Sequence, residues 1–396
     1  MRTIERTKFD SCFENNFSSS FVLYLITLLI IFFFRAKIFC MKKLQDYADD
    51  INKCSKCGLC QSVCPVYKIT GNDCAVSRGK FVMLDGVLKG DLKLNKNIEK
   101  YLDLCLKCGK CKDFCPSDID VCKIFDTAKH ECARKSFWGR VIFFLESEFV
   151  FGNVLKFLKL FKVRKIFNAQ NPTLKLLYFK GCVNEVNPAA DRAIAKILKN
   201  TGIQIVEKNF DCCGTPFLSS GNLERYEKVK EKNLRLIKET EFDYLVADCA
   251  SCQDALNNYG ENIRCINILE IISKQNIKFK FKHQRRVTFH KPCHLRKDDF
   301  VKVLFEKCEN VEYVEMKDYD ECCGFAGEFA LKNPKISREI SSAKIDNAIA
   351  TDADVILTTC PACILGLIQG SIGKKSVPKI QSLIEFLADA DEIINC

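Results

Sequence analysis

The sequence predicts an α/β protein in which a helical N-terminal region precedes two copies of one α/β module. Hydrophobic residues make up 47% and charged residues 28% of the 396 residues, which is typical of a globular chain. A cysteine pattern recurs in the second half of the chain at an almost constant interval. Around each copy, short apolar runs alternate with amphipathic runs, and strand–helix alternation predicts a mainly parallel sheet.

Residues 1–40 form a hydrophobic N-terminal extension. The run from Phe21 to Phe34 has 14 residues between polar flanks, whereas a membrane-spanning helix needs about 20. Two interpretations fit equally well: a short membrane anchor, or translated upstream sequence with the true start at Met41. A secretory signal is disfavoured because no small-residue cleavage site follows the run.

Residues 41–135 carry the pattern C-x2-C-x2-C-x3-C-P twice, among 26 cysteines in the whole chain. The first copy contains Cys54, Cys57, Cys60 and Cys64; the second contains Cys105, Cys108, Cys111 and Cys115. Three cysteines at intervals of three can bind three corners of a [4Fe–4S] cubane from one loop. Zinc sites do not need the third cysteine or the Cys-Pro that follows it. The repeated pattern therefore predicts a two-cluster, ferredoxin-like domain.

In two-cluster ferredoxins the fourth cysteine of each pattern binds the other cluster. We therefore expect Cys54, Cys57, Cys60 and Cys115 to bind cluster 1. Cluster 2 is expected to bind Cys105, Cys108, Cys111 and Cys64. The segment 65–104 that joins the two patterns is predicted to contain a helix, because Phe81, Leu84 and Leu88 recur at helical spacing.

The second half of the chain contains two sets of five cysteines, expected in modules spanning 174–283 and 284–396. The first set is Cys182, Cys212, Cys213, Cys249 and Cys252, and the second is Cys293, Cys322, Cys323, Cys360 and Cys363. Equivalent cysteines lie 110 or 111 positions apart, which indicates an internal repeat. Most of these cysteines follow predicted strands, and ligands gather at the carboxyl ends of parallel strands. Each module should therefore bring five thiolates together.

Adjacent cysteines such as Cys212–Cys213 cannot easily bind two corners of one regular cubane, because their backbones are too close. They can bind two irons of a more open cluster. Gly214 and Gly324 follow the two pairs, and glycine allows a sharp turn or a close approach of the backbone to the cluster. The alternatives, a vicinal disulfide or buried packing cysteines, do not explain why the five-cysteine set is repeated.

A Cys-Cys-Gly motif with an upstream cysteine and a downstream CxxC resembles the cysteine-rich (CCG) domain. Two ferredoxin patterns followed by two such modules resemble the iron–sulfur subunit of glycolate oxidase. They also resemble the third subunit of anaerobic glycerol-3-phosphate dehydrogenase, the lactate-utilisation iron–sulfur protein and fused heterodisulfide reductase subunits. The glycolate oxidase subunit usually lacks a complete final CxxC, whereas Cys360 and Cys363 are both present here, as in the heterodisulfide reductase type.

The resemblance implies an electron-transfer subunit of an oxidoreductase, with two [4Fe–4S] cubanes and one or two noncubane [4Fe–4S] clusters in the CCG modules. It implies that an FAD-linked 2-hydroxy-acid (glycolate or D-lactate type) dehydrogenase supplies electrons, which pass to a quinone or another acceptor. Two alternatives are disulfide redox chemistry, as in heterodisulfide reductases, and a role in anaerobic glycerol-3-phosphate dehydrogenase. No G-x-G-x-x-G is present, so no flavin is expected in this chain.

The remaining expectations concern nucleic-acid binding, the linker between the two regions, the location of the chain and the role of His290. The chain has a formal charge of +11, but bound clusters would cancel much of it and no basic stripe is interleaved with aromatic residues, so no nucleic-acid partner is expected. Residues 136–173 should form a helical linker, which either packs under the ferredoxin domain or lies on a membrane surface. The chain should therefore be cytoplasmic or peripheral to the inner membrane face. His290 has two interpretations: it interacts with the cluster, or it shapes a polar loop.

Overall fold

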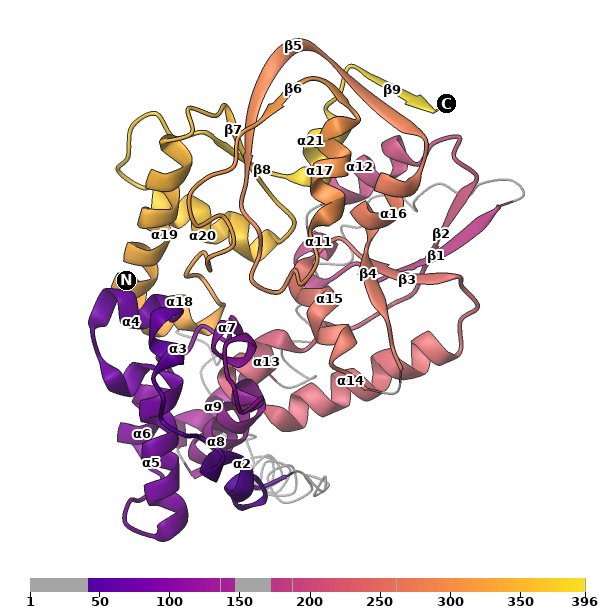
Figure 1. The fold of residues 1–396 in the computed structure, drawn as a ribbon. Helices are drawn as coiled ribbons and strands as arrows, with labels where there is room; N and C mark the ends of the chain where they lie inside the picture. The colour runs from indigo at the N-terminus through magenta and orange to yellow at the C-terminus, as the bar shows by residue number, and fades with distance from the viewer. Residues whose placement is uncertain (1–41, 136, 147–171, 187, 261, 396) are drawn as a thin grey trace, which may run out of the picture. The chain divides into compact units, whose positions relative to one another are not determined.

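A computed structural model describes residues 42–135, 137–146, 172–186, 188–260 and 262–395. The chain divides into two units, Met1–Lys42 and Lys43–Cys396, and every described helix and strand belongs to the second unit (Figure 1). The expected membrane anchor or upstream sequence in 1–40 lies outside the described residues. Across the described residues, no helix has both the length and the apolarity needed to cross a bilayer.

The ferredoxin-like region is helical, as predicted. Its elements are η1 (Leu44–Tyr47), α2 (Ala48–Asn52), α3 (Leu59–Ser62), α4 (Pro65–Thr70), η2 (Asp73–Ala75), α5 (Ser77–Lys89), α6 (Lys96–Leu102), α7 (Lys110–Asp113) and α8 (Val121–Lys135). Pro65 occupies the first turn of α4, where its missing N–H would have no helical partner in any case. The helix predicted between the two cysteine patterns is α5, which buries Phe81 and Leu84 in the core of this region.

The first module is a four-stranded parallel sheet in the order β2-β1-β3-β4. Its strands are β1 (Leu174–Tyr178), β2 (Ile203–Glu207), β3 (Tyr244–Ala247) and β4 (Cys265–Asn267). The helices between and after them are α11 (Cys182–Val186), α12 (Ala189–Ile197), α13 (Thr215–Ser220), α14 (Leu223–Lys238), α15 (Ala250–Asn257) and α16 (Ile268–Lys274). β1 and β3 confirm the strands predicted before Cys182 and Cys249, and α14 confirms the amphipathic helix between them.

The second module repeats this order as β6-β5-β7-β8, and β9 adds to β5 in the antiparallel direction. Its strands are β5 (Ile277–Phe289), β6 (Cys308–Tyr313), β7 (Val355–Thr358), β8 (Lys379–Ser382) and β9 (Glu392–Asn395). Its helices are α17 (Asp299–Glu306), α18 (Glu328–Lys332), α19 (Pro334–Ile349), α20 (Pro361–Ser371) and α21 (Leu383–Ala388). The predicted α/β fold with two repeated modules is confirmed.

The same backbone hydrogen bond recurs at equivalent places in the two modules. The amide of Phe179, just after β1, donates to the carbonyl of Val246 at 2.8 Å. The amide of His290, just after β5, donates to the carbonyl of Leu357, also at 2.8 Å. Positions 179 and 290 are therefore structural equivalents, at the 111-residue interval of the cysteines.

Two of the expected domain limits agree only partly with the helices and strands of the structure. The boundary between 283 and 284 falls inside β5, whose first residues already pair with β9 in the second sheet. In the expected linker 136–173, the described part includes α9 (Phe137–Leu145), whereas residues 147–171 lie outside the described residues. The domain limits therefore remain predictions, and the membrane-surface role of the linker does too.

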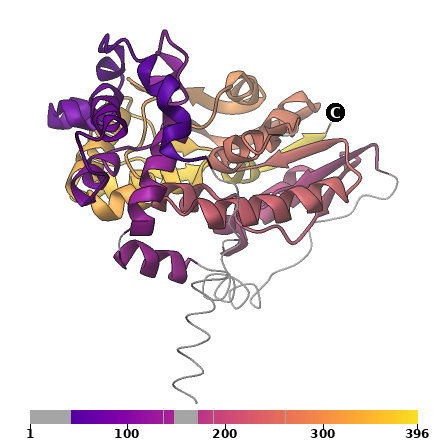
Figure 2. The same cartoon turned by 90° about the horizontal axis from the view of Figure 1, so that it is seen from below.

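The ferredoxin-like helices lie beside the second module in both views (Figures 1 and 2). α4 is joined to the turn before Cys322 by an ion pair between Lys68 and Glu321. Lys110 on α7 contacts Asp320 at 3.0 Å in the same turn. These two ion pairs hold the cysteine-bearing loops of the ferredoxin-like region next to the CC turn of the second module.

A buried lysine on α8 ties all three regions together. The ammonium of Lys129 lies 2.6 Å from Asp103 of the ferredoxin-like region and donates to the carbonyl of Ser219 in the first module at 2.6 Å. It lies 3.4 Å from Glu328 in the second module. Lys332 contacts both of these carboxylates from the other side, at 2.8 and 3.0 Å. This network fixes the regions relative to one another through charged groups withdrawn from water.

Candidate metal centres

The two ferredoxin patterns adopt the same local backbone conformation. Lys56 and Gly58 have φ of +58° and +88°, and Lys107 and Gly109 have φ of +52° and +78°. The left-handed region is unfavourable for lysine and open to glycine, so each loop curls in a way that a regular helix or strand does not. Three cysteines of each pattern lie along this curl, which is the local shape that a cubane needs.

One hollow of roughly 400 Å³, its open mouth included, collects the cysteines expected for cluster 1. Cys54, Cys57 and Cys60 line it from the first pattern, and Cys115 lines it from the second. Crossed ligation needs this placement, and the ligand assignment itself stays a prediction. Cys111, which we expect to bind cluster 2, also borders the hollow.

The cysteines expected for cluster 2 lie deeper. Cys64 and Cys111 are close enough to Cys105 for their charges to interact. Burial raises the pKa of Cys111 to about 12, and proximity to Cys105 adds to this. Burial also raises the pKa of Cys64, while the nearby Lys80 ammonium opposes the shift. The pattern search missed Lys80, which lies on α5 and donates to the carbonyls of Ala75 and Leu104.

In the first module, the CC turn and the single upstream cysteine meet. The Sγ atoms of Cys212 and Cys182 are 3.7 Å apart. Hydrogen bonds from Cys212 and then Cys252 lower the pKa of Cys213, which favours the thiolate that binds metals. Cys252 is also within hydrogen-bond reach of Cys249. All five predicted ligands of this module therefore form one connected group.

Two buried side chains that the sequence did not single out hold the CC turn of the first module. Asn233 on α14 donates to the carbonyl of Cys212 at 3.1 Å, and the hydroxyl of Tyr259 donates to the carbonyl of Cys213 at 3.0 Å. These bonds satisfy two carbonyl groups in a buried turn, where an unmade hydrogen bond would cost free energy. Asn233 lies 21 positions after Cys212 and Tyr259 lies 46 positions after Cys213, so only the folded structure brings these side chains to the two carbonyls.

Gly214 and Gly324 turn the chain after each cysteine pair, with φ of +87° and +80°. A Cβ at Gly214 would lie 2.6 Å from the ring of Tyr226, and one at Gly324 would lie 2.9 Å from the carbonyl of Ser337. The sharp turn expected from the sequence is present. The close approach is to α14 for Gly214 and to α19 for Gly324.

The second module connects its five cysteines in the same way. Cys293 is within hydrogen-bond reach of Cys322, and Cys363 is within reach of both Cys323 and Cys360. Hydrogen bonds from Cys322 and then Cys363 lower the pKa of Cys323 to about 5. The second cysteine of each CC pair is thus the one with a lowered thiol pKa.

The two five-cysteine sets touch each other. Cys249 of the first module is within hydrogen-bond reach of Cys360 of the second. Ser251, between Cys249 and Cys252, places its Oγ 3.5 Å from the Sγ of Cys360. The same Oγ is 3.0 Å from Nδ1 of His294, whose Nε2 donates to the carbonyl of Lys107 at 3.1 Å. A single histidine therefore links all three cysteine-bearing regions.

The second module also meets the ferredoxin-like region directly. Cys108 packs in one apolar cluster with Cys293 and Cys322, and with Cys64 of the first pattern. Proximity to Cys293, after burial, raises the pKa of Cys108. One expected ligand of cluster 2 thus lies against two expected ligands of the second module.

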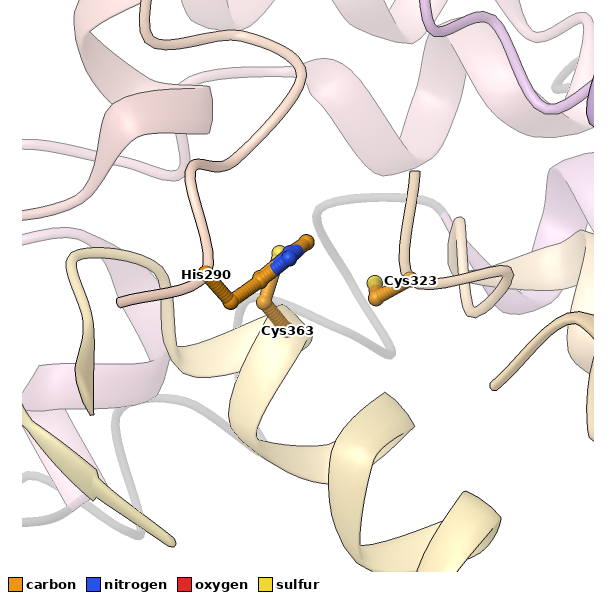
Figure 3. A group of neighbouring side chains, drawn as sticks. All are labelled: His290, Cys323 and Cys363. Atoms are coloured by element: carbon orange, nitrogen blue, oxygen red, sulfur yellow. The ribbon is translucent and has the colours of Figure 1, made fainter. Parts of the chain in front are cut away.

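His290 is buried, and a ring nitrogen of this residue and the sulfurs of Cys323 and Cys363 all lie within 4.8 Å of one another (Figure 3). The imidazole faces the cysteine set from a buried position, and its role there stays a prediction.

These donor sets suit iron–sulfur clusters on chemical grounds. Every predicted cysteine ligand is a free thiol, and soft thiolates select iron–sulfur clusters, zinc or Cu(I). Two thiol sets lie in curled loops with the cysteine spacing of ferredoxins. Each of the other two sets contains an adjacent pair and has five cysteines, one more than the four ligands of a zinc site. The residues present therefore fit iron–sulfur clusters better than a tetrahedral metal ion.

Models of known protein families match both parts of the chain. A 4Fe-4S dicluster domain matches residues 50–119, and the cysteine-rich domain (CCG) matches residues 176–257 and 287–368. One match thus covers both ferredoxin patterns, and the repeated match coincides with the two α/β modules.

Three of the curated relatives are named as subunits of oxidoreductases. The chain is 28% identical to one subunit of the fumarate reductase (CoM/CoB) of Methanothermobacter marburgensis, over 87% of this chain and 74% of the relative. It is 24% identical to one subunit of the dihydromethanophenazine:CoB–CoM heterodisulfide reductase of Methanosarcina mazei, over 86% and 94%. It is 22% identical to the glycolate oxidase iron–sulfur subunit of Escherichia coli, over 85% and 94%.

A solved structure shares the fold. A hypothetical protein from Helicobacter pylori matches with a TM-score of 0.51 and 10% identity, over 92% of this chain and 76% of that protein. At this identity the likeness concerns the arrangement of elements alone.

Proposed function

We propose, from the premise that this chain belongs to the cysteine-rich (CCG) domain iron–sulfur proteins, that it is the electron-transfer subunit of an oxidoreductase complex. In this proposal it takes electrons from a flavoprotein that oxidises a 2-hydroxy acid such as glycolate or D-lactate. It passes them to a quinone or another acceptor.

The contact between Cys108 and the second module carries the proposal. Cys108 lies against Cys293 and Cys322, and the thiols of the second module continue through Cys360 and Cys249 to those of the first. Redox centres held at these positions would be neighbours, with no long gap between the ferredoxin-like region and the CCG modules.

The chemistry that the clusters supply when bound is one-electron transfer, at potentials set by charge, hydrogen bonds and exposure. The chain contributes the environment. Burial keeps water from the thiols of the CCG modules, except those of the partly exposed Cys182 and Cys293. Lys80 brings a positive charge near Cys64, and backbone amides near Cys60, Cys64 and Cys213 donate to their sulfurs. A positive charge or a hydrogen bond at a ligand sulfur favours the reduced cluster, because it offsets the added electron.

The identity of the partner is supported by the relative named as a glycolate oxidase iron–sulfur subunit. The deciding experiment combines this chain with an FAD-linked glycolate or D-lactate dehydrogenase. Glycolate or D-lactate should reduce a quinone analogue only when both proteins are present. Turnover by this chain alone would refute the assignment, and so would a flavoprotein that transfers electrons equally well without it. Glycerol-3-phosphate serves as the substrate control.

A second candidate function is disulfide redox chemistry, favoured by the meeting of Cys249 and Cys360. The CxxC pairs of the two modules converge there, and one relative is named as a heterodisulfide reductase subunit. In this case the isolated chain, supplied with a reduced viologen dye, should convert a disulfide to two thiols with two electrons and two protons. Cys249→Ser and Cys360→Ser should each abolish that activity. Absence of disulfide-dependent dye oxidation by the intact chain would eliminate this candidate.

The number of clusters is predicted to be four per chain. Protein purified without oxygen should contain about sixteen irons and a matching amount of sulfide, since each cluster holds four irons. The double variant Cys322→Ser/Cys323→Ser should lose about a quarter of that iron. A parent protein with about eight irons, unchanged in the double variant, would show that the CCG modules bind no cluster.

A further inference from the structure

One polar side chain of the second module is fully buried without a partner. The ring of His290 has no exposed surface, and among the described residues neither ring nitrogen has a hydrogen-bond partner. The carbonyl of Tyr319 is near enough to favour the protonated ring but accepts from the amide of Lys291 at 2.9 Å instead. An imidazole buried in this way loses its hydrogen bonds to water without replacement, which costs free energy. A ligand at the ring would remove that cost.

The ring faces the cysteines of the second module. A ring nitrogen and the sulfurs of Cys323 and Cys363 are mutually within 4.8 Å. His290 follows β5, Cys323 lies in the CC turn, and Cys363 lies in the first turn of α20 (Figure 3). Three separate elements thus bring three metal-binding atoms to one point in the interior. This geometry differs from that of a histidine packed for its bulk alone.

The first module has no such group. Phe179 occupies the position equivalent to His290, with the same 2.8 Å backbone hydrogen bond to the neighbouring strand. Its ring lies 4.9 Å from that of Phe210, as part of the apolar core. The two modules share fold and cysteines, so the imidazole is a specific addition to the second one. The second module offers six donors where the first offers five.

Imidazole binds metals through the lone pair of a ring nitrogen. Imidazole is also a suitable ligand for iron in general.

We propose that His290 is a nitrogen ligand to an iron of the cluster in the second module, bound between Cys323 and Cys363. This inference rests on the proposed function, because it requires that the second module hold a cluster. The imidazole adds one neutral nitrogen donor to the five thiols of the second module, so its ligand set differs from that of the first module.

The test uses the full chain, purified without oxygen from cells fed ¹⁵N-histidine, and pulsed EPR at each step of a redox titration. Nitrogen bound to iron should give a strong coupling that changes with the isotope. His290→Phe copies the residue of the first module. It should abolish the coupling and leave the iron content unchanged. His290→Cys should also retain the iron and lose the coupling, because it supplies a thiolate in place of the imidazole.

Two matched controls use other positions of the same chain. His294 already uses both ring nitrogens, on Ser251 and on the carbonyl of Lys107, so His294→Gln should preserve the strong coupling. Phe179→His gives the first module the same sixth donor and should add a second nitrogen coupling. If a variant does not fold, the isotope-sensitive nitrogen coupling of the unmodified chain still tests whether a histidine nitrogen binds iron.

The possible outcomes separate this inference from the proposed function. Full iron content with only a weak nitrogen coupling would mean that the ring at most donates a hydrogen bond, which overturns ligation and leaves the electron-transfer role intact. A strong coupling that persists in His290→Phe would also overturn it. A second module without iron, shown by an unchanged iron count in Cys322→Ser/Cys323→Ser, would overturn both.

Discussion

Replacing Cys115 with alanine is expected to remove cluster 1 and leave cluster 2 in place, although Cys115 belongs to the second cysteine pattern. The reason is that Cys115 lines the same hollow as Cys54, Cys57 and Cys60. With one of four thiolates missing, the cluster is exposed on one side and should be lost. Iron analysis should fall by about four atoms per chain, and one of the two cubane EPR signals should disappear.

The matched variant is Cys64→Ala, which should remove the other cubane signal. Cys308→Ala serves as the neutral control, because Cys308 lies after α17 and its thiol donates to the carbonyl of Leu304 at 3.2 Å, away from every predicted cluster. If Cys115→Ala and Cys64→Ala removed each other's expected signals, each pattern would bind its own cluster and crossed ligation would be wrong.

Replacing Lys129 with methionine should lower the free energy of unfolding. The variant removes a buried cation from Asp103 and Glu328 and the donor from the carbonyl of Ser219, and it leaves the two carboxylates only the more exposed Lys332. Breaking a fully buried ion pair by removing one partner costs about 3–5 kcal/mol, and the loss here should be smaller because Lys332 still contacts both carboxylates. The methionine side chain fills most of the space, so packing changes little and the charge effect dominates.

Urea unfolding of the parent and variant, followed without oxygen by circular dichroism, would measure this loss as a lower midpoint. The control is Lys89→Met, which removes an exposed ion pair with Asp85 at 2.7 Å on α5. Exposed pairs contribute little, so its midpoint should not move. Equal midpoints for parent and Lys129→Met would show that the three regions are held together without this network.

Much of the fold follows from local patterns. Apolar runs such as 174–178 and 355–358 predicted strands, and α14 and α19 lie where amphipathic spacing placed helices. Local sequence is sufficient in these cases because the period of apolar residues decides which face of an element can be buried. The 110-residue interval between cysteines also predicted that the two modules would repeat one topology, and both sheets have the same strand order.

For the candidate sites too, some features could be predicted from the sequence and others only from the structure. Spacing alone indicated which cysteines share a loop, because one curl of backbone holds ligands that are three residues apart. It left the role of His290 open, since a histidine beside a cysteine looks the same whether its ring is buried or solvated. The structure places the ring in the interior, beside Cys323 and Cys363. Lys129 and Asn233 gave no signal in the sequence, because their partners lie 90 and 21 residues away.

Sequence patterns were enough to identify the thiols, their grouping by loop and the repeated α/β modules, because these depend on neighbours along the chain. Contacts between distant segments settled the rest: Cys108 lies against Cys293, Cys249 meets Cys360, and His290 stands where the first module has Phe179. Such contacts depend on which faces of the modules pack together. That choice is made by the summed burial of many side chains and by buried ion pairs, and no short stretch of residues encodes it.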